Sequence, residues 1–266
     1  MSAAVKAERY DVIIVGGGPA GLSAAYYLLE NSDLEVLLLE KGKSLAKRAC
    51  PSQEGQKCLN CKPCNILCGM GGAGLFSDGK LNFIHKLGKT DLTQFKTVEE
   101  AKALIEETEG IFNRFGMDSP AYPTDMEAAQ SIRKEAKRNG IDLLIIRQKH
   151  VGSDCLPGYL AGMVDHIEGK GVKVHTSEEV KDVAVKDGRV TGVATNRRSY
   201  QAGRVILAPG RVGADWVGRL ARKYGFSFTQ RGIEVGVRVE VHNDIMKDLC
   251  EVIYDPTFFI QTKKYD

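Results

Sequence analysis

The order of apolar and polar positions near the N-terminus predicts a strand, a glycine turn, a helix and a second strand. Residues 12–15 (Val-Ile-Ile-Val) form a short apolar run rich in β-branched side chains, which is typical of a buried parallel strand. Glycines follow at the spacing G-x-G-x-x-G, and residues 20–30 are rich in Ala and Leu, as in a helix. A second apolar run, residues 36–39, ends at Glu40.

Each glycine of this fingerprint has a physical reason. Gly16 permits a tight turn, Gly18 lets a pyrophosphate approach the backbone, and Gly21 lets the helix pack closely on the strand. Pro19 suits the first helical turn, where its missing N–H would have no partner anyway. From Ala20 onward, the free N–H groups and the positive dipole end of the helix favour phosphate.

Glu40 completes the pattern. It lies nineteen positions after Gly21, where a carboxylate can accept hydrogen bonds from an adenosine ribose. A glycine fingerprint alone is weak evidence, and a glycine turn without a ligand is the alternative interpretation. Strand, glycines, helix, strand and acid in this order predict a dinucleotide site.

A second glycine-rich stretch covers residues 69–74, with four glycines in six residues. Such a density indicates backbone that comes close to some other group, or turns that need a positive φ. A flexible surface loop is the alternative.

Two amphipathic helices are predicted in the middle of the chain. The first spans residues 97–115, where Thr97 and Glu100 form a capping box. Thr124 and Glu127 repeat this box before the second helix.

The rest of the chain alternates between segments with the helical period of 3.6 residues and segments with the strand period of two. Further expected elements are strands at 141–147 and 172–175, helices at 156–168 and 215–223, and a β-rich segment from Glu234. From Val180 the pattern predicts a three-strand antiparallel meander, with a hairpin turn at Asp187-Gly188. The meander leads into a buried strand at 205–208.

Composition excludes several function classes. The 266 residues carry a net charge of +3, which gives no strong field for nucleic acid or an acidic membrane. The N-terminus lacks the apolar core of a signal peptide, and no apolar run approaches the ~20 residues of a membrane span. A cytoplasmic protein without an integral membrane segment is therefore expected.

The glycine fingerprint, residues 40–42 (Glu-Lys-Gly), the meander and residues 208–210 (Ala-Pro-Gly) together resemble the FAD domain of glutathione-reductase-type flavoproteins. The stretch from Cys50 to residues 71–81 (Gly-Gly-Ala-Gly-Leu-Phe-Ser-Asp-Gly-Lys-Leu) is more specific. It resembles a group of FAD-dependent dehydrogenases that are distantly similar to electron-transfer flavoprotein–quinone oxidoreductase and geranylgeranyl reductase.

The resemblance implies FAD as cofactor, bound by its adenosine end. The implied cofactor-binding residues are Gly16, Gly18, Pro19, Ala20, Gly21, Glu40, Lys41, Gly71, Gly72, Gly74, Val180, Ala208 and Gly210. Two departures stand out: a Thr of the family pattern is replaced by Pro209, and the Gly-Asp element that closes the flavin pocket in the family is missing. We therefore expect a chain that lacks its C-terminal part and an open flavin site with weak FAD affinity.

The expected fold class is α/β, a Rossmann-type FAD-binding domain with a β-meander crossover, interrupted by an α+β substrate domain. The expected segments are 1–90 and 169–215 for the FAD domain, and 91–168 and 216–266 for the substrate domain.

Five of the seven cysteines lie between residues 50 and 68. Because no secretory signal is present, metal or redox chemistry is favoured over structural disulfides. Cys58, Cys61, Cys64 and Cys68 have the spacing of ligands to a [4Fe-4S] cluster, and Cys50 is a rival fourth ligand. Zinc is the main alternative, and free thiols or a redox disulfide are the others.

No catalytic acid or base can be assigned from sequence. Of five scattered histidines, His150 is the best placed, at a strand end before a helix, while Ser77, Asp78 and Lys80 follow the glycine stretch and could reach the flavin. The leading hypothesis is an FAD-dependent oxidoreductase that transfers electrons between flavin and a small-molecule substrate or electron carrier, with a cluster as a conceivable relay. The alternative is a non-catalytic or truncated flavin-binding module with a structural cysteine-bound metal.

Overall fold

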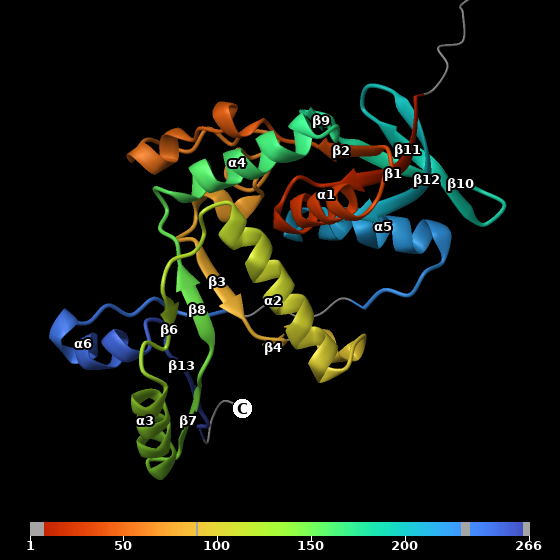
Figure 1. Cartoon of the computed structure of the whole chain (residues 1–266). Helices are drawn as coiled ribbons and strands as arrows, with labels where there is room; N and C mark the ends of the chain where they lie inside the picture. The colour runs from red at the N-terminus through yellow and green to blue at the C-terminus, as the bar shows by residue number, and fades with distance from the viewer. Residues whose placement is uncertain (1–7, 89, 230–234, 263–266) are drawn as a thin grey trace, which may run out of the picture. The chain divides into compact units, whose positions relative to one another are not determined.

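A computed structural model describes residues 8–88, 90–229 and 235–262 (Figure 1). The chain divides into two compact units. The first unit comprises Met1–Ser77 and Ser153–Gln230, and the second comprises Asp78–Gly152 and Arg231–Asp266. Among the described residues, no helix is long and apolar enough to cross a membrane.

The structure contains helices and strands with the following bounds. The helices are α1 (Pro19–Asn31), α2 (Val98–Arg114), α3 (Met126–Arg138), α4 (Leu156–Gly169), α5 (Ala214–Tyr224) and α6 (Asn243–Val252). The strands are β1 (Arg9–Val15), β2 (Val36–Glu40), β3 (Lys80–Phe83), β4 (Lys86–Leu87), β5 (Thr90–Asp91), β6 (Ala121–Tyr122), β7 (Ile141–Leu144), β8 (Arg147–His150), β9 (Lys173–Thr176), β10 (Val180–Lys186), β11 (Arg189–Thr195), β12 (Ser199–Leu207) and β13 (Thr257–Ile260).

The first unit is built on a six-stranded sheet with the order β10-β11-β12-β1-β2-β9 (Figure 1). The strands β12, β1, β2 and β9 run parallel, while β10, β11 and β12 form an antiparallel meander. The expected α/β class, a parallel Rossmann-type sheet with a meander, is confirmed. The parallel strands place their carboxyl ends at one edge, where ligands of open α/β sheets bind.

Both faces of the central strands β1 and β2 are covered, which explains why residues 12–15 and 36–39 are continuously apolar. Ile13 and Leu37 face a cluster that includes Tyr200, with Trp216 of α5 packed against it. Ile14 faces the other side, toward Gly21 of α1. Complete burial of each large aliphatic side chain contributes ~2 kcal/mol to folding.

The second unit contains smaller sheets. β3, β8 and β6 form a three-stranded antiparallel sheet in the order β3-β8-β6, and β7 pairs with β13. α2 packs beside β3 and α3 beside β7. The expected first capping box is present: the Thr97 hydroxyl accepts from the Glu100 N–H, and the Glu100 carboxylate accepts from the Thr97 N–H.

Four sequence predictions of secondary structure are wrong in detail. The cap of α3 is Asp125, whose carboxylate accepts from two backbone N–H groups, because Thr124 instead donates its hydroxyl hydrogen to the Glu251 carbonyl. The strand expected at 141–147 is broken into β7 and β8, which pair with different partners. The third meander strand and the expected buried strand at 205–208 are one strand, β12.

The largest difference concerns the β-rich segment expected from Glu234, which itself lies outside the described residues. Residues 235–242 form no strand, although valines alternate along them, and α6 follows. Val235 and Val237 are 86% and 89% exposed. Alternation alone did not decide the structure, because a strand also needs a neighbour, and none of the described residues pairs with this segment.

The boundaries between the units also differ from the expected segments. Residues 78–90 lie in the second unit because β3 pairs with β8 there. α4 lies in the first unit, where it packs against α1, and α5 also lies there, where Trp216 joins the sheet cluster.

Candidate cofactor-binding site

The fingerprint glycines lie at the carboxyl edge of the parallel sheet. β1 ends at Val15 and leads into Gly16, and β2 ends at Glu40. Ala208 follows β12 and donates its N–H to the Val15 carbonyl, 2.8 Å away. The structure therefore brings the ends of three neighbouring strands together around the glycine turn.

Two of the three fingerprint glycines are required by packing. A Cβ on Gly16 would lie 2.1 Å from the Ala208 carbonyl oxygen, and its φ is +111°. A Cβ on Gly21 would lie 1.9 Å from the Gly16 carbonyl oxygen. Any side chain at either position would separate strand from strand or helix from turn.

Gly18 is different, because no protein contact requires it to be glycine. Its φ is −81°, which any residue adopts, and the nearest atom to an added Cβ is Gly72 Cα at 3.6 Å. Because no contact within the protein requires glycine at this position, the space beside Gly18 Cα is available to a ligand. This is where the sequence predicts the pyrophosphate.

The beginning of α1 suits an anion at the same place. Gly18 is the N-cap and has no side chain to cap the helix, Pro19 occupies the first turn, and no acidic residue lies in that turn. The N–H groups and the positive dipole end of α1 are therefore not neutralised by an acidic side chain of the first turn, which leaves them suited to an anion.

Glu40 holds three backbone segments together. Its Oε2 accepts from the Gly17 N–H at 2.8 Å, and its Oε1 accepts from Gly42 and Gly69 at 2.7 and 2.9 Å. A carboxylate has about four acceptor positions, so one remains on Oε2 for a ribose hydroxyl. Glu40 thus has a structural role: its carboxylate joins the glycine fingerprint, the end of β2 and Gly69 of the second glycine-rich stretch.

The glycine loop, defined as residues 69–74, packs directly on the fingerprint. The Gly71 N–H donates to the Gly17 carbonyl at 2.8 Å, and a Cβ on Gly72 would lie 3.0 Å from Gly18 Cα. Gly69, Gly71 and Gly72 all have positive φ values. Close approach and positive φ, the two reasons expected from the sequence, both occur here, whereas Gly74 has space around it.

Arg48 organises the glycine loop, and sequence reasoning missed it. Its side chain is buried, and its N–H groups donate to five carbonyl oxygens: those of Asn65, Ile66, Gly69, Met70 and Gly72. The guanidinium also lies over the Phe76 ring, 4.8 Å from its centroid. Burial lowers the pKa of Arg48, yet such a side chain stays charged. No motif spacing marks this arginine.

The segment 177–180, for which the resemblance implies contact of the Val180 backbone with adenine, is fastened to the end of β2. The Ser177 N–H donates to the Gly42 carbonyl at 2.6 Å, and the Glu178 N–H donates to the Glu40 carbonyl at 3.0 Å. Val180 itself is buried in the sheet cluster.

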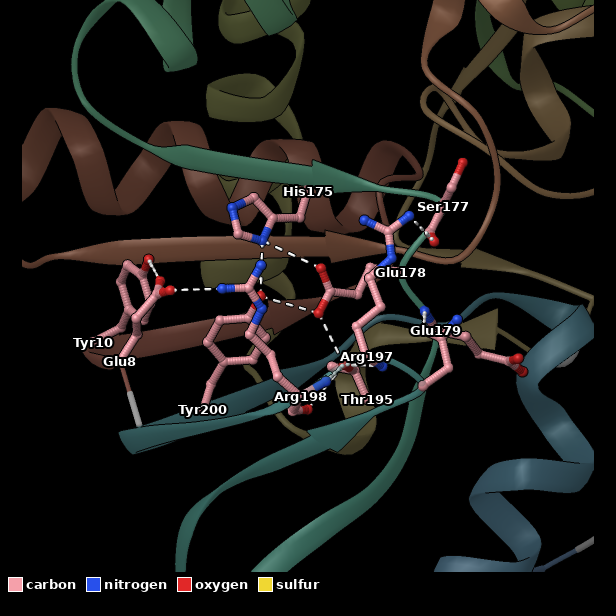
Figure 2. Close-up of polar contacts among 11 residues, drawn as sticks. Glu8, Tyr10, His175, Ser177, Glu178, Glu179, Thr195, Arg197, Arg198 and Tyr200 are labelled. Atoms are coloured by element: carbon pink, nitrogen blue, oxygen red, sulfur yellow. Dashed lines mark hydrogen bonds and ion pairs between the residues drawn. The ribbon is translucent and has the colours of Figure 1, made fainter. Parts of the chain in front are cut away.

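Figure 2 shows the Glu178 carboxylate in the centre of the polar contacts that hold this segment. Its Oε1 accepts from Tyr200 at 3.0 Å and from Thr195 at 2.8 Å, and its Oε2 lies 3.3 Å from His175 Nδ1. Burial and the bond to Glu178 raise the pKa of Tyr200, so its hydroxyl remains a donor. The network links β9, β11 and β12 to the segment 177–180 and was not predicted from sequence.

The remaining implied residues lie at the same edge. Gly210, with a φ of +63°, precedes a short turn of 3-10 helix and then α5. Lys41 is half-buried directly after Glu40. Thus the first unit gathers the glycine fingerprint, Glu40, Gly71, Gly72 and Ala208, as a dinucleotide site requires.

The described residues do not support the metal centre that the cysteine spacing predicts. All seven cysteines are among the described residues. Within these residues, no group of three His, Cys, Asp or Glu side chains could hold a metal ion. Cys58 and Cys61 are exposed, whereas Cys68 is buried and burial raises the pKa of its thiol. In the same segment, the Arg48 guanidinium accounts for the backbone arrangement through its bonds to the carbonyl oxygens of Ile66, Met70 and Gly72.

The other residues considered for chemistry are divided between the two units. In the second unit, His150 stacks on Tyr254 with ring centroids 3.9 Å apart, and its Nε2 is buried without a hydrogen-bond partner among the described residues. Burial lowers its pKa. Lys80 forms an ion pair with Asp255, and Ser77 of the first unit donates to the Gly74 carbonyl.

A second charged network, also missed from sequence, lies in the second unit. Glu109 of α2 is buried and accepts from Arg147 and from Lys149, the latter at 2.8 Å. Lys149 also donates to Asn113 at 2.8 Å. Hydrogen bonds from Arg147 and Lys149 lower the pKa of Glu109 to about 2.

This network predicts a loss of stability in acid. The pKa of Glu109 is lowered in the folded state, so its contribution is present above the unfolded value of 4.5 and lost as the pH falls toward about 2. Because Arg147 is half exposed and screened by water, we expect Glu109→Gln to remove only about 2 kcal/mol of this pH-dependent stability. Urea unfolding at pH 7, 4 and 3 measures it. An unchanged difference between wild type and variant across this range would contradict the assignment.

Comparisons with known proteins agree with the geometry. The sequence model of the FAD-dependent oxidoreductase family (DAO) matches residues 11–226. An uncharacterised protein of Clostridium beijerinckii is 26% identical over 230 residues, which is 86% of this chain and 36% of that protein. A putative FAD-dependent oxidoreductase, LodB of Marinomonas mediterranea, is 54% identical over 35 residues, 13% of this chain and 10% of its own length.

Solved structures are similar at a lower level. L-amino acid deaminase from Proteus vulgaris, with its specific insertion deleted, has a TM-score of 0.48 and 16% identity over 82% of this chain and 58% of its own. Glycine oxidase from Geobacillus kaustophilus has a TM-score of 0.47 and 19% identity over 83% and 59%. The chain thus spans little more than half of these enzymes, and likeness at this level does not indicate its substrate.

Proposed function

Because this chain belongs to the DAO family of FAD-dependent oxidoreductases, we propose that it binds FAD with the adenosine diphosphate half at the carboxyl edge of its parallel sheet. The observation that carries the proposal is Gly18, which has space on its Cα and no packing reason to be glycine. The pyrophosphate would occupy this space, on the N–H groups at the start of α1.

The adenosine would meet the neighbouring segments. Glu40 has one acceptor position left for a ribose hydroxyl, and the backbone near Val180, held by the Glu178 network, would face the adenine. The glycine loop would line the cofactor where Gly72 approaches Gly18. Lys41, Ala208 and Gly210 belong to the same proposal.

The proposed reaction is electron or hydride transfer between the flavin and a small-molecule substrate or electron carrier. Bound FAD supplies the redox chemistry, and the protein supplies binding, orientation and electrostatics. We assign no acid or base. The narrower kinship to dehydrogenases of the electron-transfer flavoprotein–quinone oxidoreductase and geranylgeranyl reductase type, and a location in the cytoplasm, are further parts of this proposal.

A direct experiment is titration of the apoprotein with FAD and, separately, with ADP. We expect both to bind competitively, because they share the adenosine diphosphate half, and riboflavin not to displace ADP. If ADP does not compete with FAD, the proposed placement is wrong. Reduction of bound flavin by a donor with repeated turnover supports an oxidoreductase, while flavin that binds but never turns over supports the alternative of a non-catalytic flavin-binding module.

The metal prediction is tested separately and carries no step of the proposed reaction. Iron, zinc and acid-labile sulfide are measured in anaerobically purified protein and in Cys61→Ala, since Cys61 belongs to every ligand set predicted from the spacing. The exposed position of Cys61 leads us to expect equal metal content and FAD affinity in both proteins. Stoichiometric iron that disappears in Cys61→Ala would establish the cluster and contradict the present arrangement of this segment.

A further inference from the structure

The second unit contains a pocket that the proposed function does not use. It has a volume of about 540 Å³, a size typical of small-molecule sites. Phe83, Ile84 and Ile105 give it apolar walls. Its polar lining residues are His85, Lys102, Glu106, Glu109 and Arg147. All of its lining residues belong to the second unit, so its geometry does not depend on the first.

Arg147 is placed by the pairing of β3 with β8. Phe83 and Arg147 are cross-strand partners, and the guanidinium carbon lies 5.3 Å from the centroid of the Phe83 ring. Two guanidinium N–H groups donate to the two oxygens of Glu109. Among the described residues, the other three of its five N–H groups have no hydrogen-bond partner. The stacked and paired guanidinium is therefore oriented before any ligand arrives.

The charges around this guanidinium do not cancel. Glu109 is shared between Arg147 and the buried Lys149, so one carboxylate faces two cations. The exposed Lys102 also lines the pocket, and no ion pair to it occurs among the described residues. Glu106 lines the pocket too. The pKa of Arg147 is raised by its hydrogen bonds to Glu109 and, to a smaller extent, by the charge of Glu106. The lining itself carries two cations, Arg147 and Lys102, and two carboxylates, Glu106 and Glu109. The one further positive charge comes from Lys149, which is bonded to Glu109 but does not line the pocket.

We propose that this pocket binds an organic carboxylate with an apolar or aromatic body. A carboxylate matches the planar N–H edge of a guanidinium, and it would lie on Arg147 with its body against Phe83 and Ile105. Inorganic phosphate could pair with the Arg147 guanidinium, but it has no apolar part to contact Phe83 and Ile105. The inference is independent of the flavin site.

Calorimetric titration of the full chain with 3-phenylpropionate tests the proposal, and 3-phenylpropionamide is the neutral match of equal size. We expect the acid to bind on the order of tenfold more tightly than the amide, with an affinity that falls as salt is raised. Inorganic phosphate should bind more weakly than the acid. Equal affinities for acid and amide, or no binding of the acid, would overturn the proposal.

Three charge-neutralising variants separate electrostatics from damage to the fold. Arg147→Gln should weaken binding of the acid on the order of tenfold, and Lys149 still pairs with Glu109 in that variant. Glu106→Gln removes the opposing charge from an exposed side chain and should tighten binding about twofold.

Arg133→Gln, on the exposed side of α3, is the matched control and should change nothing. Thermal unfolding confirms that each variant is folded. Opposite signs for Arg147→Gln and Glu106→Gln cannot come from a common loss of structure. Weakening by both, or by neither, would refute the assigned site.

Discussion

Replacing Gly18 with valine is expected to abolish FAD binding while the sheet remains folded. The Cβ of the added side chain has room in the apoprotein, where the nearest atom is 3.6 Å away, and the side chain would fill the space proposed for the pyrophosphate. We expect the affinities for FAD and ADP to fall at least about 100-fold, as for severe overpacking. The free energy of unfolding of the apoprotein should change by no more than about 1 kcal/mol, the range of an N-cap substitution.

Two neighbouring glycines provide the controls. Gly21→Ala should lower the stability of the apoprotein by about 2 kcal/mol or more, because its Cβ would lie 1.9 Å from the Gly16 carbonyl oxygen. Gly158→Ala, in α4, adds a Cβ with no neighbour within 4 Å beyond the adjacent residues and the helix backbone, so it should leave FAD affinity unchanged and raise stability by up to about 1 kcal/mol through helix propensity. Ligand titration and urea unfolding of the three variants measure these effects. Full FAD affinity in Gly18→Val would contradict the proposed site.

The parts of the fold that the sequence predicts well are those with a local cause. The apolar runs around Ile14 and Leu38, the glycines between them and the hairpin turn at Asp187-Gly188 each constrain the backbone by their own residues. The capping box at Thr97 is equally local. For this reason the order of strands and helices in the first unit could be predicted without any knowledge of distant contacts.

The predictions that failed depended on partners distant in the sequence. Thr124 loses its capping role because Glu251, far along the chain, offers a carbonyl oxygen, and Asp125 takes that role. The valines of residues 235–242 alternate as in a strand but pair with no described residue. The metal centre suggested by the local spacing of the cysteines stays a prediction that the described residues do not support. The Arg48 contacts that hold the same segment join residues distant in the sequence and could not be predicted from spacing.

The candidate site shows the same division. Gly16, Gly18 and Gly21 could be assigned from spacing, and the structure adds that only Gly18 has no packing reason to be glycine. Glu40 could be recognised by its distance from the fingerprint, but not its three backbone partners. Glu178 carries no motif, because its importance comes from strands that meet only in the folded sheet.

Arg48 is expected to show the largest effect on stability of any single side chain in the first unit. Arg48→Met would remove the one donor that the described residues offer to each of three carbonyl oxygens, those of Asn65, Ile66 and Met70. The carbonyl oxygens of Gly69 and Gly72 would each keep a backbone N–H donor. Unpaired buried acceptors are costly, and we expect a loss of about 3 kcal/mol or more in the free energy of unfolding. FAD affinity should fall with it, because the loop that packs on Gly17 and Gly18 would no longer be held.

Arg48→Lys distinguishes charge from geometry. Lysine keeps the positive charge, but its single ammonium has three N–H groups and cannot span carbonyls that the guanidinium reaches from three nitrogen atoms. If geometry is what organises the loop, Arg48→Lys should lose most of the FAD affinity at a temperature where the apoprotein remains folded. Arg189→Met, an exposed arginine of β11, is the control and should leave unfolding and FAD titration unchanged. Wild-type stability and FAD affinity in Arg48→Lys would show that charge alone is sufficient, and the guanidinium geometry would then have no role in building the cofactor site.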